Sequence, residues 1–198
     1  MYQENRILWM TYCLIGINVI VFLNEIRRLG LGVLMQNHIA PGAFLEVGAM
    51  AKQTVFHGGW FELISSQFVH FSFMHIFLNM WVLYCVGRDL ESLIGPVKLL
   101  IFYLLTGLVG NIATLFLINS STVSAGASGA IMGLMGVMAI ILIFKSHQFG
   151  IINGANVAKS YIGLLVLNII NGLITTGTNN VAHIFGAIAG IILGFVAI

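Results

Sequence analysis

Six long apolar runs, separated by short polar or glycine-containing stretches, dominate this sequence of 198 residues. A helix that spans a bilayer needs about 20 mostly apolar residues, and a soluble domain carries roughly a quarter charged residues. Here 59% of the residues are apolar and only 7% are charged. The sequence therefore predicts an all-α, polytopic membrane protein whose six transmembrane helices lie at residues 8–23, 71–86, 97–117, 126–144, 160–174 and 181–198.

The connections between these runs are mostly short and uncharged, which indicates one membrane domain over residues 1–198. The exception is the stretch from about residue 24 to 60, which holds a proline, several glycines and apolar segments too short to span, such as 39–45. Loops of this length tend to be functional or disordered, and we expect this one to lie at the membrane interface. Arg6 precedes the first run, but no small-residue cleavage pattern follows before Arg27, so we predict an uncleaved helix instead of a signal peptide.

The low charge of the chain restricts its partners. A net charge of +2, without a basic patch interleaved with aromatic residues, argues against a nucleic-acid partner and leaves the lipid bilayer as the expected one. No metal-binding or phosphate-binding motif occurs, so we predict no metal and no cofactor. Cys13 and Cys85 fall inside predicted spans, where a free cysteine behaves as a small apolar residue.

Lysine and arginine in the short loops set the predicted orientation, because these residues favour the cytoplasmic side. With the N-terminus inside, the inner face carries Arg6, Arg88, Lys98, Lys145 and Lys159, against Arg27, Arg28 and Lys52 outside. This balance favours an N-terminus on the inner side. In either orientation the spans at 71–86, 126–144 and 181–198 begin at the same face. The polar residues near these three starts, which are His70, His75, Asn79, Ser128 and His183, are therefore predicted to converge at one depth.

Glycines recur at helical spacing in two of these spans. They are Gly129, Gly133 and Gly136 in one and Gly186, Gly190 and Gly194 in the other. Helices in lipid approach closely through small residues, and residues at this spacing lie on or near one face. We expect the two helices to touch, with Ser128 and His183 near one edge of the contact.

A serine hydroxyl becomes a nucleophile when a base lies within hydrogen-bond reach, and the unperturbed pKa of histidine suits that task. His183 is the first candidate base for Ser128. No Asp or Glu follows Glu91, whose side chain is expected at the opposite face, and Glu62 is expected at the water interface. The sequence therefore predicts a Ser–His dyad without an acid. Met132, four residues after Ser128, is placed to contact the imidazole through its sulfur.

Acyl transfer also needs hydrogen-bond donors for the developing oxyanion. Asn79 lies four residues after His75, so the two share one face of a helix. The backbone N–H of Ser128 at a helix start is a third donor, aided by the helix dipole. Taken singly, each residue has an ordinary structural explanation: serine and asparagine in helix packing, His70 and His75 at a membrane boundary, glycines in close contact. Their coincidence at one face favours the functional interpretation, since ionisable groups at membrane depth are costly.

Three motifs resemble those of the rhomboid intramembrane serine proteases, over residues 60–194. The His-x-x-x-x-His-x-x-x-Asn pattern resembles residues 70–79, the Gly-x-Ser-Gly box resembles 126–129, and the Ala-His-x-x-Gly helix resembles 182–186. The resemblance implies a six-helix rhomboid-like bundle in which Ser128 is the nucleophile, His183 the general base, and Asn79 with His75 the oxyanion donors. Gly126, Gly129, His70, Met132 and Gly186 are then supporting motif residues.

By this resemblance, the substrates are single-span transmembrane proteins cleaved near the membrane boundary. The span at 160–174 and the loop at 175–180 would be the mobile side through which they arrive. Two departures stand out: Phe61-Glu62 replaces a Trp-Arg pair, and Met132 replaces a common aromatic residue. Neither removes a catalytic residue. A bacterial plasma membrane is the expected location, because the chain shows no obvious organellar leader.

Three other functions stay open at this point. A non-catalytic relative that binds client transmembrane helices is the main alternative, although the intact Ser128 and His183 argue against it. A small transporter is disfavoured by the lack of carboxylates after Glu91, and a metalloprotease by the lack of an acidic ligand near the inner histidines. The sequence leaves the oligomeric state open.

Overall fold

The apolar runs form six long helices within the part of the chain that the computed structural model describes, residues 8–35, 39–118, 122–175 and 177–197. These helices are α1 (Trp9–Leu29), α4 (Phe73–Ile94), α5 (Pro96–Leu117), α6 (Ser128–Lys145), α7 (Gly154–Ile174) and α8 (Asn180–Val196). Each contains most of one predicted span. Arg6 and the last residue of the 181–198 span lie outside the described residues.

Four stretches of described helix are long and apolar enough to cross a membrane: α1, α5, α6 together with the 3-10 turn that follows it, and α7. α8 is apolar but has 17 residues, and α4 carries Arg88, Asp89 and Glu91 in its last turns. The chain is therefore an integral membrane protein, as predicted. The count of six spans stays a prediction.

Several helices extend beyond the predicted spans. α1 continues past residue 23 to Leu29, α4 continues past residue 86 to Ile94, and α7 begins at Gly154 instead of residue 160. The predicted spans ended where the sequence became polar. A helix can continue past that point, because its backbone hydrogen bonds do not depend on apolar side chains and the polar side chains find partners of their own. The long connection after α1 therefore begins at Gly30, and the predicted start at residue 24 was wrong.

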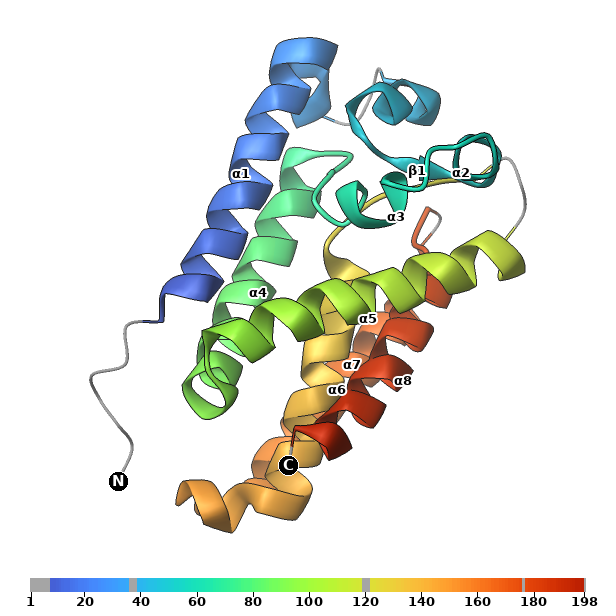
Figure 1. Cartoon of the computed structure of the whole chain (residues 1–198). Coiled ribbons are helices and arrows are strands. Elements are labelled where there is room, and N and C mark those ends of the chain that lie inside the picture. The colour runs from blue at the N-terminus through green and yellow to red at the C-terminus, as the bar shows by residue number, and fades with distance from the viewer. Residues whose placement is uncertain (1–7, 36–38, 119–121, 176, 198) are drawn as a thin grey trace.

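This connection between α1 and α4 is built from short elements (Figure 1). They are the 3-10 helices η1 (Leu31–Leu34) and η2 (Pro41–Val47), strand β1 (Met50–Ala51), and the short helices α2 (Lys52–Phe56) and α3 (Glu62–Ser65). β1 pairs antiparallel with β2 (Val123–Ser124), with Met50 opposite Ser124. The fold is thus mostly helical with one small two-stranded sheet, which ties the connection to the segment just before α6.

Glu62 is buried, with 5% of its surface exposed, so its carboxylate is enclosed by protein, and its expected depth at the water interface stays a prediction. The Thr54 hydroxyl donates a hydrogen bond to the Glu62 carboxylate. Gly59 lies against this pair, since a Cβ there would stand 2.7 Å from Glu62 Oε1. The Glu62 side chain, at the start of α3, thus points into the folded connection, where it is paired with Thr54 and is not exposed.

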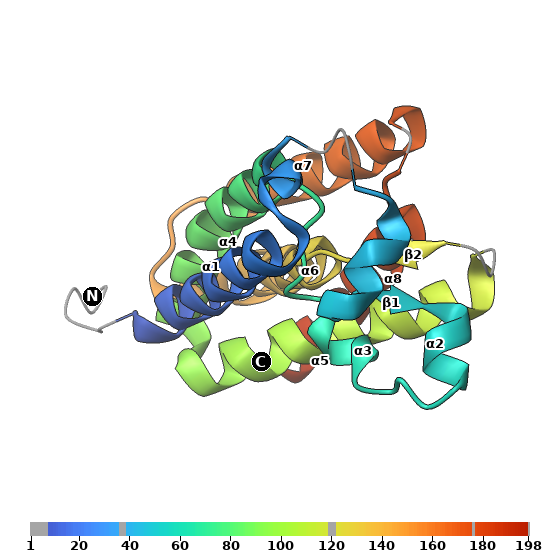
Figure 2. The ribbon, with the colours of Figure 1, turned by 90° about the horizontal axis from the view of Figure 1, so that it is seen from above.

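α6 lies at the centre of the bundle, where it packs against α4, α5, α7 and α8 (Figure 2). Most of its side chains are buried, from Gly129 to Leu142 without a break. A helix that is apolar on every side belongs in such a central position. The first residue of this central helix is Ser128.

Two buried carboxylates attach α1 to the rest of the bundle. Glu91 of α4 accepts hydrogen bonds from the backbone N–H groups of Met10 and Thr11, at 2.9 and 2.8 Å, and from the Thr11 hydroxyl at 2.6 Å. These N–H groups lie in the first turn of α1, where no carbonyl of the same helix can accept from them. At the other end of α1, Glu25 accepts from the backbone N–H of His70 at 3.2 Å.

Candidate active site

Neighbouring long helices alternate in direction, so α4, α6 and α8 all begin at the same end of the bundle (Figure 1). We call this end the site end. His75 lies in the first turn of α4, Ser128 opens α6, and His183 lies in the first turn of α8. The predicted convergence of these three residues at one end is confirmed by the contacts between them, described next.

Glycines bring α6 and α8 into backbone contact, as the spacing predicted. A Cβ at Gly186 would overlap the carbonyl of Gly129, and a Cβ at Gly190 would overlap the carbonyl of Gly133. At Gly136 a Cβ would stand 2.7 Å from Ala187 O. At these glycines the backbones of the two helices are in direct contact, whereas further along α8 Gly194 packs against the side chain of Ile140.

Ser128 and His183 meet at the site end of this crossing. The distance from Ser128 Oγ to His183 Nε2 is 2.8 Å, which is hydrogen-bond length. His183 is 7% exposed, and its Nδ1 atom has no hydrogen-bond partner among the residues that the structure describes. For Nε2 to accept the serine proton, Nδ1 must carry the ring hydrogen. This geometry would suit a nucleophile and a base, and within the described residues no carboxylate bonds to Nδ1 of the imidazole.

The segment before Ser128 is held in an unusual backbone conformation. Gly126 has φ +130°, a value that favours glycine, and its N–H donates to Ser66 O at 2.8 Å. A Cβ at this position would stand 2.9 Å from the ring of His75. Gly126 therefore allows the imidazole of His75 to lie directly against the turn that leads into α6.

The hydrogen bonds of His75 indicate which ring nitrogen carries the proton. Nδ1 accepts from the backbone N–H of Phe71 at 3.4 Å, so the proton is assigned to Nε2. Nε2 is one of the two ring atoms nearest to Gly126, and the Ser128 hydroxyl lies on the same side of that glycine. His75 thus presents an N–H donor beside the nucleophile candidate.

Asn79 lies one turn further along α4 and is mostly buried. Its amide donates one hydrogen bond to His75 O at 3.1 Å. An amide has two N–H groups, so the second is available as a donor. The role of Asn79 at an oxyanion stays a prediction.

His70 supports His75 from the side. The two rings meet edge to face, with centroids 4.9 Å apart, and His70 Nδ1 lies 3.1 Å from Phe68 O. Burial, together with the neighbouring His75, lowers the pKa of His70 to about 3. A neutral, fully buried imidazole of this kind packs and orients its neighbour.

The other predicted support residues lie on the same helices. Gly129 and Gly186 form the backbone contact of the α6–α8 crossing that lies nearest to Ser128 and His183 in the sequence. Met132 is buried in α6, and its contact with the His183 ring stays a prediction. Among the described residues, no group of three or more His, Cys, Asp or Glu side chains is placed to hold a metal ion.

Two residues at this site were missed by sequence reasoning. Glu25, which holds the backbone of His70, was placed in a loop because hydropathy ended the first span too early. Asn179 accepts from the N–H of Ala182 at 3.0 Å and so caps α8. An asparagine immediately before an apolar helix is a capping signal that the sequence does contain.

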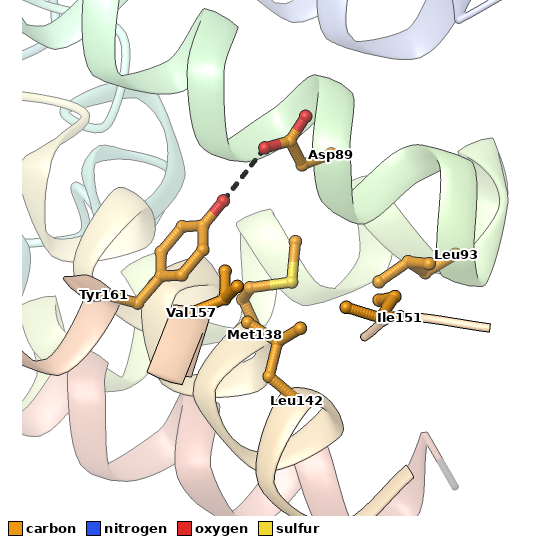
Figure 3. Close-up of a pocket in the computed structure, with 7 residues that line it drawn as sticks. All are labelled: Asp89, Leu93, Met138, Leu142, Ile151, Val157 and Tyr161. Atoms are coloured by element: carbon orange, nitrogen blue, oxygen red, sulfur yellow. Dashed lines mark hydrogen bonds between the residues drawn. The ribbon is translucent and has the colours of Figure 1, made fainter. Parts of the chain in front are cut away.

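Space also remains between α4 and α7. A cavity of about 380 Å³ lies between them, lined by Trp81, Val82, Cys85, Val86, Ser160, Tyr161 and Leu164. A second cavity, of about 170 Å³, lies where α4, α6 and α7 meet (Figure 3). There the Tyr161 hydroxyl donates to Asp89 Oδ2 at 3.0 Å. We call the larger cavity the α4–α7 groove.

The chain is similar to known proteins of one family. The family model described as the Rhomboid domain matches residues 57–198. The chain is 27% identical over 144 residues to the putative rhomboid protease YdcA of Bacillus subtilis, covering 73% of this chain and 70% of that protein. It is 33% identical over 152 residues to RHOMBOID-like protein 5 of Arabidopsis thaliana, covering 76% of this chain and 48% of that protein.

A third relative is the rhomboid protease GluP of Bacillus subtilis. The chain is 30% identical to it over 143 residues, covering 72% of this chain and 27% of that protein. The chain thus spans less than half the length of two of these three relatives.

Proposed function

The chain belongs to the rhomboid family, and on that premise we propose that it is an intramembrane serine endopeptidase. Ser128 is the nucleophile and His183 the general base, and the pair works without a carboxylate. The observation that carries this proposal is the 2.8 Å contact between Ser128 Oγ and His183 Nε2 at the end of a buried helix. A structural serine in a membrane helix needs no such partner from another helix.

The proposed reaction is a two-step acyl transfer. His183 Nε2 takes the proton of the Ser128 hydroxyl as Oγ attacks the peptide carbonyl, and then gives that proton to the leaving amine. Water, deprotonated by the same nitrogen, releases the acyl group from Ser128. The negative charge on the carbonyl oxygen is stabilised by His75 Nε2–H, the free N–H of Asn79 and the backbone N–H of Ser128.

The proposed substrates are single-span transmembrane proteins that reach the dyad through the α4–α7 groove. This flank is favoured because α7 buries only Gly154, Ala158 and Leu165 among its described residues. Water must reach the dyad from the site end. Cleavage is therefore expected near the membrane boundary at that end.

The setting of the site completes the proposal. The chain forms a single six-span membrane domain with its N-terminus inside, in a bacterial plasma membrane. The connection between α1 and α4 lies at the interface, where its exposed Phe56, Trp60 and Phe61 favour the headgroup region. No cofactor takes part.

The test uses the full chain purified in detergent, a panel of reporter proteins with one transmembrane span, and a fluorophosphonate that labels activated serines. Wild type should cleave at least one reporter and take up the label, whereas Ser128→Ala and His183→Ala should do neither. Ser92→Ala and His147→Ala, at the opposite end of the bundle, should behave as wild type. Activity should persist in a chelator.

Cleavage by Ser128→Ala would refute the proposed mechanism. A wild type that neither cleaves any reporter nor reacts with the fluorophosphonate, yet holds a reporter helix, would instead support the non-catalytic alternative.

A further inference from the structure

Asn179 makes three side-chain hydrogen bonds at the start of α8. Its Oδ1 atom accepts from the backbone N–H of Ala182 at 3.0 Å. Its Nδ2 atom donates to Thr114 Oγ1 at 2.9 Å and to Ser124 Oγ at 2.8 Å. All three bonds are within the usual range, and the last two reach different parts of the chain.

The Ser124 bond leads to the nucleophile candidate. Ser124 is buried in β2, where it is paired with Met50, and it lies two residues before Gly126. Gly126 is fixed in turn by its bond to Ser66 O and by the ring of His75. The position of Ser124 therefore helps to define where the chain enters α6 and where the Ser128 hydroxyl points.

The Thr114 bond leads to α5. The Thr114 hydroxyl donates to Gly110 O at 2.8 Å and accepts from Asn179. Gly110 packs directly on the first turn of α8, because a Cβ there would stand 2.7 Å from Ala182 O. The amide of Asn179 therefore lies beside the close contact between the backbones of α5 and α8 at Gly110 and Ala182.

His183 depends on this arrangement through its own backbone. Its N–H donates to Asn179 O at 3.3 Å, so the imidazole is carried on the turn that Asn179 begins. A displacement of about 1 Å at a reacting group can reduce a rate by about 100-fold. Any tilt of this first turn would move Nε2 relative to Ser128 Oγ.

We propose that Asn179 is a positioning residue for the dyad: one amide ties the helix that carries His183 to the strand that leads to Ser128. This proposal rests on the proposed protease function. Its neighbour Asn180 has a different task, since Asn180 Nδ2 donates to Ile169 O of α7. Of these two adjacent asparagines, Asn179 bonds to α5 and β2, and Asn180 bonds to α7.

The test separates the two hydrogen bonds that Asn179 donates to Thr114 and Ser124 from its role as the cap of α8. Asn179→Ser keeps a good capping hydroxyl but has no amide to reach Thr114 and Ser124. The double variant Thr114→Val/Ser124→Ala keeps the cap and removes both acceptors. Asn156→Ala, which removes an exposed asparagine near the start of α7, is the matched control. For each, kcat and KM with a reporter, the rate of fluorophosphonate labelling and Tm are measured.

We expect Asn179→Ser to lower kcat and the labelling rate by roughly 10- to 100-fold, with KM changed by less than about 3-fold. The double variant should lower kcat and the labelling rate by a similar factor. Adding Asn179→Ser to the double variant should have little further effect, because the hydrogen bonds of Asn179 to Thr114 and Ser124 are already lost. Tm should stay close to wild type, since the cap remains.

Two results would overturn the inference while leaving the proposed function intact. One is an Asn179→Ser variant with kcat within about 2-fold of wild type while Ser128→Ala is inactive. The other is a loss of kcat no larger than the loss of folded protein. Cleavage by Ser128→Ala would overturn the proposed function itself, and this inference with it.

Discussion

The two flanks of α6 are built in different ways. On the α8 side, glycine carbonyls and Cα atoms are in direct contact, and even one added methyl group has no space. On the side where α4 and α7 meet, two cavities lie between the helices. At the smaller cavity, a hydrogen bond from Tyr161 to Asp89 joins α7 to α4 (Figure 3). The closed flank holds Ser128 against His183. The open flank is the one through which we propose that a substrate helix arrives.

The closed flank should tolerate no added volume. Gly190→Ala places a methyl group on the backbone of Gly133, which cannot rotate away, and should destabilise the fold by roughly 3 kcal/mol. Gly163→Ala on α7, where nothing lies within 4 Å, is the control and should stabilise its helix by about 0.5–1 kcal/mol. Thermal unfolding in detergent measures both. Equal Tm values for the two variants would remove the contrast between the flanks.

One face of α4 belongs to the site and should affect catalysis. Asn79→Ala removes a proposed oxyanion donor and should lower kcat by roughly 100-fold. Its stability loss should be near 1 kcal/mol, since it also loses the bond to His75 O. Asn168→Ala is the matched control, because Asn168 makes the same type of bond to Leu164 O on α7. Parallel losses of kcat and stability would identify Asn79 as a packing residue only.

The other face of α4 lines the groove and should affect access. Cys85 and an introduced Ser160→Cys both line the cavity, so a bifunctional thiol reagent can link them. The link should lower cleavage of a transmembrane reporter by about 10-fold and leave fluorophosphonate labelling unchanged, because the dyad is not touched. Cys13→Ala removes the other free cysteine. Full cleavage by the linked protein would show that substrates arrive elsewhere.

The smallest effect is expected at the bridge between α4 and α7. Tyr161→Phe removes the hydroxyl that donates to Asp89 and should cost about 1 kcal/mol of stability. Because α7 is then held less firmly, kcat for a transmembrane reporter should rise by about 2-fold. Tyr12→Phe, in exposed surface of α1, is the control. A decrease in kcat without loss of folded protein would mean that the bridge aids catalysis.

Much of the helical fold could be predicted from the sequence, because apolar runs of this length form helices in lipid whatever their neighbours are. The regular spacing of glycines in α6 and α8 likewise predicted that these two helices are in contact. The dyad partners Ser128 and His183 could be found because both stand near the starts of spans that begin at one face. Their 2.8 Å contact needed the structure.

The errors share one physical cause. Hydropathy ended α1 and α4 at their polar residues, but Glu25 and Glu91 are buried with backbone N–H groups as partners. Glu62 is likewise buried, with the Thr54 hydroxyl as its hydrogen-bond donor. A polar side chain is tolerated in the interior when a distant residue supplies its hydrogen bond, and local sequence does not reveal that residue.

The sequence by itself determined a membrane-embedded helical protein, the direction of each helix relative to the next, and the residues that we propose for serine chemistry. Tertiary structure alone decided the contact geometry: which nitrogen of His75 carries the proton, how Asn179 joins α8 to β2, and which flank stays open. Hydrophobicity and residue spacing are properties of short stretches of sequence, so their structural consequences can be predicted from those stretches alone. Hydrogen bonds between residues about 50 to 80 positions apart exist only after folding brings both partners together.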